Sequence, residues 1–219
     1  MGASGRQRAW QAAGTAAAAL VEDRRRVGLG TGRAAAAGIT ALGERVRGGL
    51  RCTGVPTSRA SAALARSVGI RVGRLRGPLD LAFDGADAVD PDGVLVKGAG
   101  GAMVRERVVA QAAARFLVLV DGPKMVTSLD VWGVLPIAVI PFAAARVMDV
   151  VDEFAPVQRD VRSDDGLVLI DLTVPAGASW PALAERVGAI AGVVDHGLFV
   201  VPRTDVFIGA PDGTVTHAG

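Results

Sequence analysis

A chain of 219 residues has room for one large domain, or for a large domain and a small one. Half of the residues are hydrophobic, so a substantial core can form, and 29 glycines favour tight turns between closely packed α/β layers. The formal net charge is only +2 and no basic tract is interleaved with aromatic residues, which argues against a nucleic-acid partner.

The composition indicates a soluble protein, which we expect in the cytoplasm. The single cysteine, Cys52, cannot form an intramolecular disulfide, in keeping with a reducing compartment. Two arginines before an alanine-rich stretch superficially resemble a signal peptide, but Gly14 and the acidic residues that follow favour an amphipathic helix. No apolar run approaches the ~20 residues of a membrane span, so no membrane partner is expected. The two histidines lie far apart, and no Cys/His cluster has the spacing of metal ligands.

Helix and strand signals alternate through the first 130 residues. Helices are expected near 8–23, 33–44, 57–67 and 102–114, and strands near 26–29, 49–53, 70–72, 79–84 and 116–121. The last of these strands, FLVLVD, is almost continuously apolar, as in a parallel strand buried on both faces. The alternation predicts an α/β fold with a doubly wound, mostly parallel sheet flanked by helices.

The pattern changes after about residue 130. LPIAVI predicts a strand, followed by a proline and a helix; LVLIDLTV and GVVDHGLFV predict further strands, with the helix WPALAERVGAI between them. This β-α-β-β-α-β-like order fits a second, smaller α+β domain of ferredoxin-like type. Since the closing stretch can return to the large sheet, we expect the large domain over 1–130 and 204–219 and the small one over 131–203.

A glycine-rich turn, VGLGTGRAAAA at 27–37, connects the first strand to a helix. Backbone N–H groups at such a helix start favour phosphate. The turn is not the dinucleotide fingerprint G-x-G-x-x-G, because the third glycine falls on Arg33, and it lacks the G-K-S/T of a P-loop. A tight connection that binds no ligand is an equal alternative for this turn.

The stretch LAFDGADAVDPDGVLVKGAGGAMVRERVV, 81–109, collects groups suited to acid–base chemistry. Asp84 and Asp87 follow the carboxyl end of a strand, where α/β folds place their sites. Lys97 leads into three glycines, and Glu106 lies in the first or second turn of the next helix. Each residue alone could serve only a turn or a helix end. Together, the carboxylates and the lysine beside a flexible turn indicate an acid–base site.

The DGAD…KGAGG…RE block resembles the active-site signature of type A ribose-5-phosphate isomerases. Other matches occur in register at 27–32 (VGLGTG), 55–58 (VPTS), 135–143 (LPIAVIPFA) and 192–199 (GVVDHGLF), so the similarity covers nearly the whole chain. The resemblance implies a Rossmann-like sheet, a small α+β domain, no metal or organic cofactor, and a homodimer or homotetramer.

The resemblance also implies the reaction, an aldose–ketose interconversion of D-ribose 5-phosphate and D-ribulose 5-phosphate through an enediolate. Glu106 would be the base that moves a proton between C1 and C2, and Lys97 would stabilise the enediolate oxyanion. Asp84 and Asp87 would bind sugar hydroxyls and assist ring opening, with Asp84 the preferred acid/base. The residues implied to bind the phosphorylated sugar are Gly30, Thr31, Gly32, Arg33, Ala34, Gly98, Gly100, Gly101 and Lys124.

The sequence departs from the family pattern mainly at the phosphate end. Arg33 and Ala34 replace two hydroxyl residues of the usual G-T-G-S-T turn, Ala99 interrupts the usual KGGGG run, and Lys124 follows Gly-Pro where a serine is common. An arginine can bind an anion through the two parallel N–H groups of its planar guanidinium, and we favour direct contact between Arg33 and the phosphate. In the alternative, Arg33 points to solvent and the phosphate is bound more weakly.

Three functions follow from this pattern. The first is isomerisation of ribose 5-phosphate, and the second is the same chemistry on a different phosphorylated sugar in a specialised pathway. The third is a non-catalytic sugar-phosphate sensor, a role known for proteins of this fold. The intact Glu106 and Lys97 argue against the sensor.

Overall fold

The computed structural model of the protein describes residues 2–218. The chain divides into two compact units. The first comprises Met1–Ala86, Arg105–Met125 and Val201–Gly219, and the second comprises Asp87–Val104 and Val126–Val200. Segment 87–104, which the sequence pattern places with the large domain, clusters with the second unit.

The first unit is built on a seven-stranded sheet with the order β14-β13-β7-β4-β1-β2-β3. All neighbours are parallel except β13 and β14. The order runs outward from the centre in both directions, and this is the doubly wound topology that the alternation predicts. The strands are β1 (Arg25–Leu29), β2 (Cys52–Pro56), β3 (Arg71–Val72), β4 (Leu81–Gly85), β7 (Phe116–Asp121), β13 (Thr204–Gly209) and β14 (Val215–Ala218).

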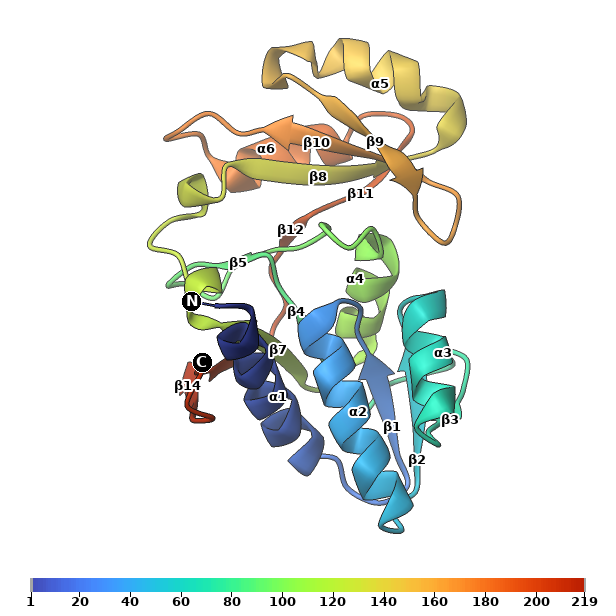
Figure 1. Cartoon of the computed structure of the whole chain (residues 1–219). Helices are drawn as coiled ribbons and strands as arrows, with labels where there is room; N and C mark the ends of the chain where they lie inside the picture. Colours follow the sequence, from blue (N-terminus) through green and yellow to red (C-terminus); the bar gives the residue numbers. More distant parts are fainter. Residues whose placement is uncertain (1, 219) are drawn as a thin grey trace. The chain divides into compact units, whose positions relative to one another are not determined.

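Helices cover both faces of this sheet. They are α1 (Ala3–Ala19), α2 (Arg33–Arg47), α3 (Arg59–Ser67) and α4 (Met103–Ala112), whose first two residues belong to the second unit. α1 and α2 lie side by side (Figure 1), and at their crossing a Cβ on Gly14 would come within 2.5 Å of the Gly38 nitrogen. On β1, Leu29 packs in the core beneath α1 and α2, whereas Gly28 faces Val109 of α4. Alternate residues of the strand thus meet helices on opposite faces.

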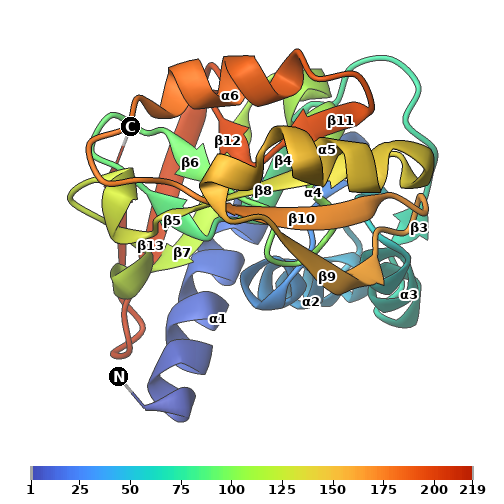
Figure 2. The same ribbon diagram turned by 90° about the horizontal axis from the view of Figure 1, so that it is seen from above.

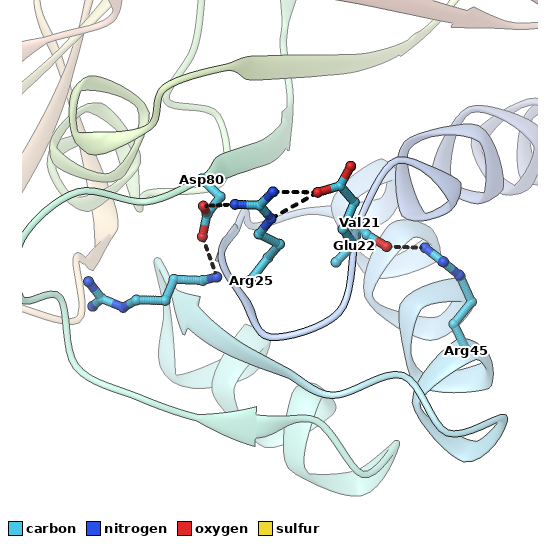
Figure 3. Close-up of polar contacts among 6 residues, drawn as sticks. Val21, Glu22, Arg25, Arg45 and Asp80 are labelled. Atoms are coloured by element: carbon cyan, nitrogen blue, oxygen red, sulfur yellow. Dashed lines mark hydrogen bonds and ion pairs between the residues drawn. The ribbon is translucent and has the colours of Figure 1, made fainter.

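Ion pairs and carbonyl contacts secure the end of the sheet at which β1 begins (Figure 3). Arg25 donates a hydrogen bond to Asp80 Oδ1 at 3.0 Å and also pairs with Glu22. Arg45, near the end of α2, donates to the carbonyl of Val21 at 2.6 Å. The same nitrogen donates to the Ala18 carbonyl, so Arg45 binds one backbone acceptor in the last turn of α1 and one just beyond it. The contacts join α1, α2 and β1 at the amino-terminal ends of the strands, opposite the carboxyl ends of β1 and β4.

The second unit contains a four-stranded antiparallel sheet with the order β11-β8-β10-β9. Together with its two helices the chain runs β-α-β-β-α-β, so the predicted ferredoxin-like arrangement is confirmed. Helices α5 and α6 lie over one face of the sheet (Figure 2). The core between them contains residues such as Ile137, Ile170 and Val187. The elements are β8 (Val134–Val139), α5 (Ala144–Val150), β9 (Val157–Arg162), β10 (Val168–Thr173), α6 (Trp180–Gly188) and β11 (Val193–His196), with 3-10 turns at Leu129–Val131, Pro141–Ala143 and Asp152–Phe154.

A small antiparallel sheet completes the second unit, and the sequence did not predict it. Its strands, in the order β12-β6-β5, are β12 (Leu198–Phe199), β6 (Leu95–Val96) and β5 (Ala88–Val89). The run GVVDHGLFV, predicted as one strand, divides at Gly197 into β11 and β12. The division occurs where two backbones nearly touch, since a Cβ on Gly197 would lie 2.3 Å from the Lys97 carbonyl oxygen.

Other differences from the sequence-based expectation are local. The strand expected at 49–53 is β2, which begins at Cys52, because Gly49 adopts a φ of +104° and turns the chain after α2. The predicted order includes a strand at the place of β9, but no segment was assigned to it, because Val157 and Val161 are exposed and no apolar face shows in its sequence. No helix within residues 2–218 is both long enough and apolar enough to span a membrane.

Candidate active site

The glycine turn follows β1 and Asp84 lies in β4, and the strand order reverses between these two strands. Ligands of doubly wound sheets bind beyond the carboxyl ends of the strands at this switch point. Asp84 is buried, with 2% of its surface exposed, and its Oδ1 accepts the N–H groups of Thr31 at 3.0 Å and Gly85 at 2.7 Å. A Cβ on Gly30 would lie 2.2 Å from Asp84 Cγ, so only glycine permits this approach.

Hydroxyl groups from the residue after β2 and from α3 support the same turn. Thr31 Oγ1 lies 2.7 Å from Thr57 Oγ1 and 3.2 Å from Ser61 Oγ. The Ser61 hydroxyl donates to the Gly30 carbonyl at 2.5 Å, and Thr57 Oγ1 donates to the Leu29 carbonyl at 3.2 Å. Sequence reasoning assigned neither hydroxyl a role, although Thr57 lies in the VPTS segment matched to the family and Ser61 lies three residues after that segment. Their role is to hold the backbone of the glycine turn.

The start of α2 presents the positive end of its dipole beside this turn. The amides of Gly30 and Thr31 are used within the protein, the former by the Phe83 carbonyl at 2.9 Å and the latter by Asp84. The helix begins at Arg33 after Gly32, whose φ is +100°, and no side chain caps it. The first amides of a helix have no partner within the helix. In α2 these are the amides of Arg33, Ala34 and Ala35, since the N–H of Ala36 donates to the Gly32 carbonyl at 2.9 Å.

The Arg33 guanidinium stacks on an aromatic ring that sequence reasoning overlooked. Its Cζ lies 4.6 Å from the ring centroid of Trp10, a half-buried residue of α1. Such a cation–π contact restricts a long side chain while leaving its N–H groups available. A tryptophan in an otherwise alanine-rich helix was the only sequence signal for this contact.

Trp10 and Arg33 line a hollow of about 1010 Å³ formed by α1, α2 and α3. Arg6 also lines it, and its Nε lies 3.7 Å from Oδ2 of Asp121 at the end of β7. Asp121 is buried, with 2% exposed, and its Oδ1 has no hydrogen-bond partner among the described residues. The hollow therefore carries two guanidinium groups, one stacked and one paired with a carboxylate.

Two further predicted residues belong to the first unit. Glu106 lies in the first turn of α4 and only 4% of its surface is exposed. A carboxylate this deeply buried is uncommon and marks a functional candidate. Lys124 ends the 3-10 turn Gly122–Lys124 directly after β7, and its side chain is half-buried.

In the second unit, Lys97 follows β6 and is buried, with 3% exposed. Its Nζ lies 5.7 Å from the ring centroid of Phe199, and its backbone N–H donates to the Gly197 carbonyl at 2.8 Å. The small sheet thus holds both the backbone and the aromatic neighbour of the lysine. Burial of an ammonium group is costly unless charges or dipoles compensate it, which makes Lys97 a second functional candidate.

A tight glycine turn follows Lys97. Gly98 and Gly101 adopt φ values of +122° and +74°, and Gly101 N–H donates to the Gly98 carbonyl at 3.0 Å. Ala99 is exposed and is not among the residues with positive φ, so its methyl group is accommodated without strain. The N–H of Ala99 donates to Asp87 Oδ2 at 2.9 Å, which ties the turn to one of the predicted carboxylates.

The predicted site residues are divided between the two units. The first unit holds Gly30, Thr31, Gly32, Arg33, Ala34, Asp84, Glu106 and Lys124, and the second holds Asp87, Lys97, Gly98, Gly100 and Gly101. The chain passes from one unit to the other between Ala86 and Asp87, within the DGAD motif itself. Within residues 2–218, no group of three or more His, Cys, Asp or Glu side chains is placed to hold a metal ion.

Comparison with known proteins gives a consistent result. Residues 53–213 match the family described as ribose 5-phosphate isomerase A (phosphoriboisomerase A). Proteins named ribose-5-phosphate isomerase A from Thermomicrobium roseum and Haloarcula marismortui are 40% and 41% identical to this chain. The alignments cover 95% and 97% of this chain and 93% and 96% of theirs.

Solved structures agree with the sequence match. The ribose 5-phosphate isomerase A of Methanocaldococcus jannaschii superimposes with a TM-score of 0.88 at 33% identity, covering 95% of this chain and 97% of its own. A D-ribose-5-phosphate isomerase in complex with phospho-erythronic acid gives 0.88 at 30% identity, covering 97% and 98%. On this sequence and structural similarity, the chain belongs to the ribose 5-phosphate isomerase A family.

Proposed function

We propose that this protein interconverts D-ribose 5-phosphate and D-ribulose 5-phosphate through an enediolate. The observation that carries the proposal is the burial of three ionisable side chains of the family signature. Asp84, Lys97 and Glu106 are only 2%, 3% and 4% exposed. Burial of ionisable groups opposes folding. Their presence together in the family signature therefore supports a catalytic role for these side chains.

In the proposed reaction, Glu106 removes the proton from C2 of the open-chain aldose. The C–H electrons form the C1=C2 double bond, and the carbonyl electrons move to O1, where the Lys97 ammonium stabilises the negative charge. Glu106 then delivers the proton to C1. The proton of the O2 hydroxyl passes to the O1 oxyanion as the C2=O2 double bond forms, which gives the ketose. Asp84 acts as acid/base in ring opening and Asp87 binds a sugar hydroxyl.

The bound ligand of one relative supports this assignment. Phospho-erythronic acid, named in the solved complex, carries both a phosphate and a carboxylate. A carboxylate resembles an enediolate in having two adjacent oxygens that share negative charge. A site that stabilises an enediolate is therefore suited to such a compound.

We assign the binding of the substrate's phosphate group to the start of α2. The uncapped amides there and the stacked Arg33 supply hydrogen-bond donors and positive charge in place of the hydroxyls of other family members. Lys124 adds a second cation, and the glycines of the turn after Lys97 hold the sugar backbone. The same Arg33–Trp10 stack favours a second candidate, in which the preferred substrate is a different phosphorylated aldose.

The first experiment replaces the base. Glu106→Gln is expected to bind ribose 5-phosphate with nearly unchanged affinity and to lose roughly 10²–10⁴-fold in kcat, since it cannot accept a proton. Glu185→Gln, at an exposed position of α6, serves as the control. Wild-type turnover in the Glu106 variant would refute the assigned chemistry.

The second experiment tests the phosphate end. Arg33→Ala should raise the KM for ribose 5-phosphate while leaving the binding of unphosphorylated ribose unchanged, and Arg47→Ala at the other end of α2 should change neither. Equal effects on both sugars would show that Arg33 is not a phosphate ligand. Comparing kcat/KM over a panel of aldose phosphates then ranks the two candidate substrates, and binding without turnover throughout would favour a sensor.

Assembly is part of the same proposal. We expect a homodimer or homotetramer, and size-exclusion chromatography with light scattering distinguishes these from a monomer.

A further inference from the structure

The Arg159 side chain connects β9 and β10 to the glycine turn within the second unit. Its Nε and one terminal nitrogen form a two-pronged ion pair with Asp171, at 2.8 and 2.5 Å. Its other terminal nitrogen donates to the carbonyl of Gly98 at 2.7 Å and of Ala99 at 3.3 Å. Arg159 is 17% exposed and Asp171 is 29% exposed, so the pair is partly shielded from water. Only the planar, five-donor guanidinium group can serve a carboxylate and two carbonyls at once.

One peptide group is held from both sides by these contacts. The Gly98 carbonyl and the Ala99 N–H belong to the same peptide plane; Arg159 donates to the carbonyl, and Asp87 accepts the N–H at 2.9 Å. A rotation of this plane would break both hydrogen bonds. The conformation being held is an unusual one, with Gly98 at a φ of +122° and a Cβ there only 3.0 Å from Pro136.

We propose that Arg159 and Asp171 are positioning residues, which lock the Gly98–Ala99 peptide and thereby orient Asp87 and the backbone after Lys97. This inference rests on the proposed function, because it gives the two residues a purpose in the isomerase site without contact with the substrate. Asp171 orients the guanidinium group, Arg159 fixes the peptide, and the peptide N–H fixes the Asp87 carboxylate. Displacement of a catalytic group by about 1 Å costs on the order of 10²-fold in rate.

The test compares Arg159→Lys with Arg162→Lys, a matched change on the same strand whose guanidinium group donates to the carbonyl of Gly166. A lysine has a single nitrogen and cannot hold Asp171 and the turn together. We expect kcat to fall by about 10- to 100-fold while KM changes by less than about threefold. We also expect exchange of the Ala99 amide proton, followed by NMR without substrate, to accelerate about tenfold or more. Arg162→Lys should alter neither quantity.

Asp171→Asn is the second variant and carries the test if Arg159→Lys does not fold. It should also lower kcat and accelerate exchange of the Ala99 amide proton. The double variant should lose little more kcat than either single variant, because both substitutions disrupt the same Asp171–Arg159–peptide contact. Unchanged exchange at Ala99, or unchanged kcat with accelerated exchange, would overturn the proposal. If the wild-type protein does not isomerise ribose 5-phosphate, the proposed function fails separately, and the exchange rates still decide whether Arg159 locks the peptide.

Discussion

Gly30→Ala tests the close approach of the glycine turn to Asp84 in the first unit. The new Cβ would lie 2.2 Å from both Cγ and Oδ1 of Asp84 and 2.6 Å from its Cα, so rotation of the side chain cannot relieve the clash. The two groups must separate by about 1.2 Å to reach an ordinary contact of 3.4 Å, which forces β1 and β4 apart. Asp84 would then lose its hydrogen bonds to the Thr31 and Gly85 amides, now 3.0 and 2.7 Å long.

The expected loss of folding free energy in Gly30→Ala follows from the steric clash and from the two lost hydrogen bonds. Overpacking costs about 1–3 kcal/mol, and a hydrogen bond to a charged group contributes about 1.5–3 kcal/mol. We expect a loss of roughly 3–5 kcal/mol, because partial relaxation recovers some of the total. For a chain of this length 1 kcal/mol corresponds to about 2–4 °C, so Tm should fall by about 10 °C. If Asp84 has its proposed role, kcat/KM should fall about 100-fold or more.

The assay is thermal unfolding followed by circular dichroism, with isomerase turnover measured on the same preparations. Gly85→Ala is the matched control, because a Cβ there meets nothing closer than 3.8 Å and Gly85 has no positive φ. Its Tm should stay within a few degrees of wild type, since a compatible Gly→Ala change is worth only about 0.4–1 kcal/mol. A Gly30→Ala protein as stable as the control would refute the close approach of the turn to Asp84.

Three further outcomes follow from the fold. Burial raises the pKa of the Cys52 thiol, so a disulfide reagent at pH 7 should modify it roughly tenfold or more slowly in the native protein than in denaturant; equal rates would contradict its burial. Hydrogen bonds from the amide of Gly177 and from Trp180 Nε1 lower the pKa of the Asp130 carboxyl. The ionised carboxylate therefore stabilises the folded state above pH about 4, the ordinary pKa of an aspartate. This stabilisation is lost as the pH falls through the lowered pKa of the folded state. Asp130→Asn should lower Tm at pH 7, with a difference from wild type that shrinks in acid; a difference independent of pH would exclude this linkage. Gly209→Ala should lower Tm strongly, because its Cβ would lie 1.9 Å from a backbone carbonyl of α1, and an unchanged Tm would show that α1 does not pack there.

Much of the architecture could be predicted because it depends on local pattern. The run FLVLVD coincides with β7, since a parallel strand buried on both faces must be apolar along its length. The helices of both units were found because each shows an apolar or alanine-rich face between glycine, proline or serine boundaries. β5 and β6 were missed and β12 was predicted only as the end of a longer strand, because a two-residue strand exists only through its pairing with a distant segment.

The candidate site divides in the same way. The sequence by itself determined which side chains are available for proton transfer and charge stabilisation, among them Asp84, Lys97 and Glu106. This is because the chemistry of a side chain depends on its residue type, and the spacing of a motif can be read directly from the sequence. Only the tertiary structure decided that Gly30 must be a glycine and that the Gly98–Ala99 peptide is held by Arg159. The bond between Thr31 and Asp84 spans 53 residues of sequence and the one between Arg159 and Gly98 spans 61. Contacts of that range form only when a sheet has folded and its neighbouring strands bring distant segments to the same edge.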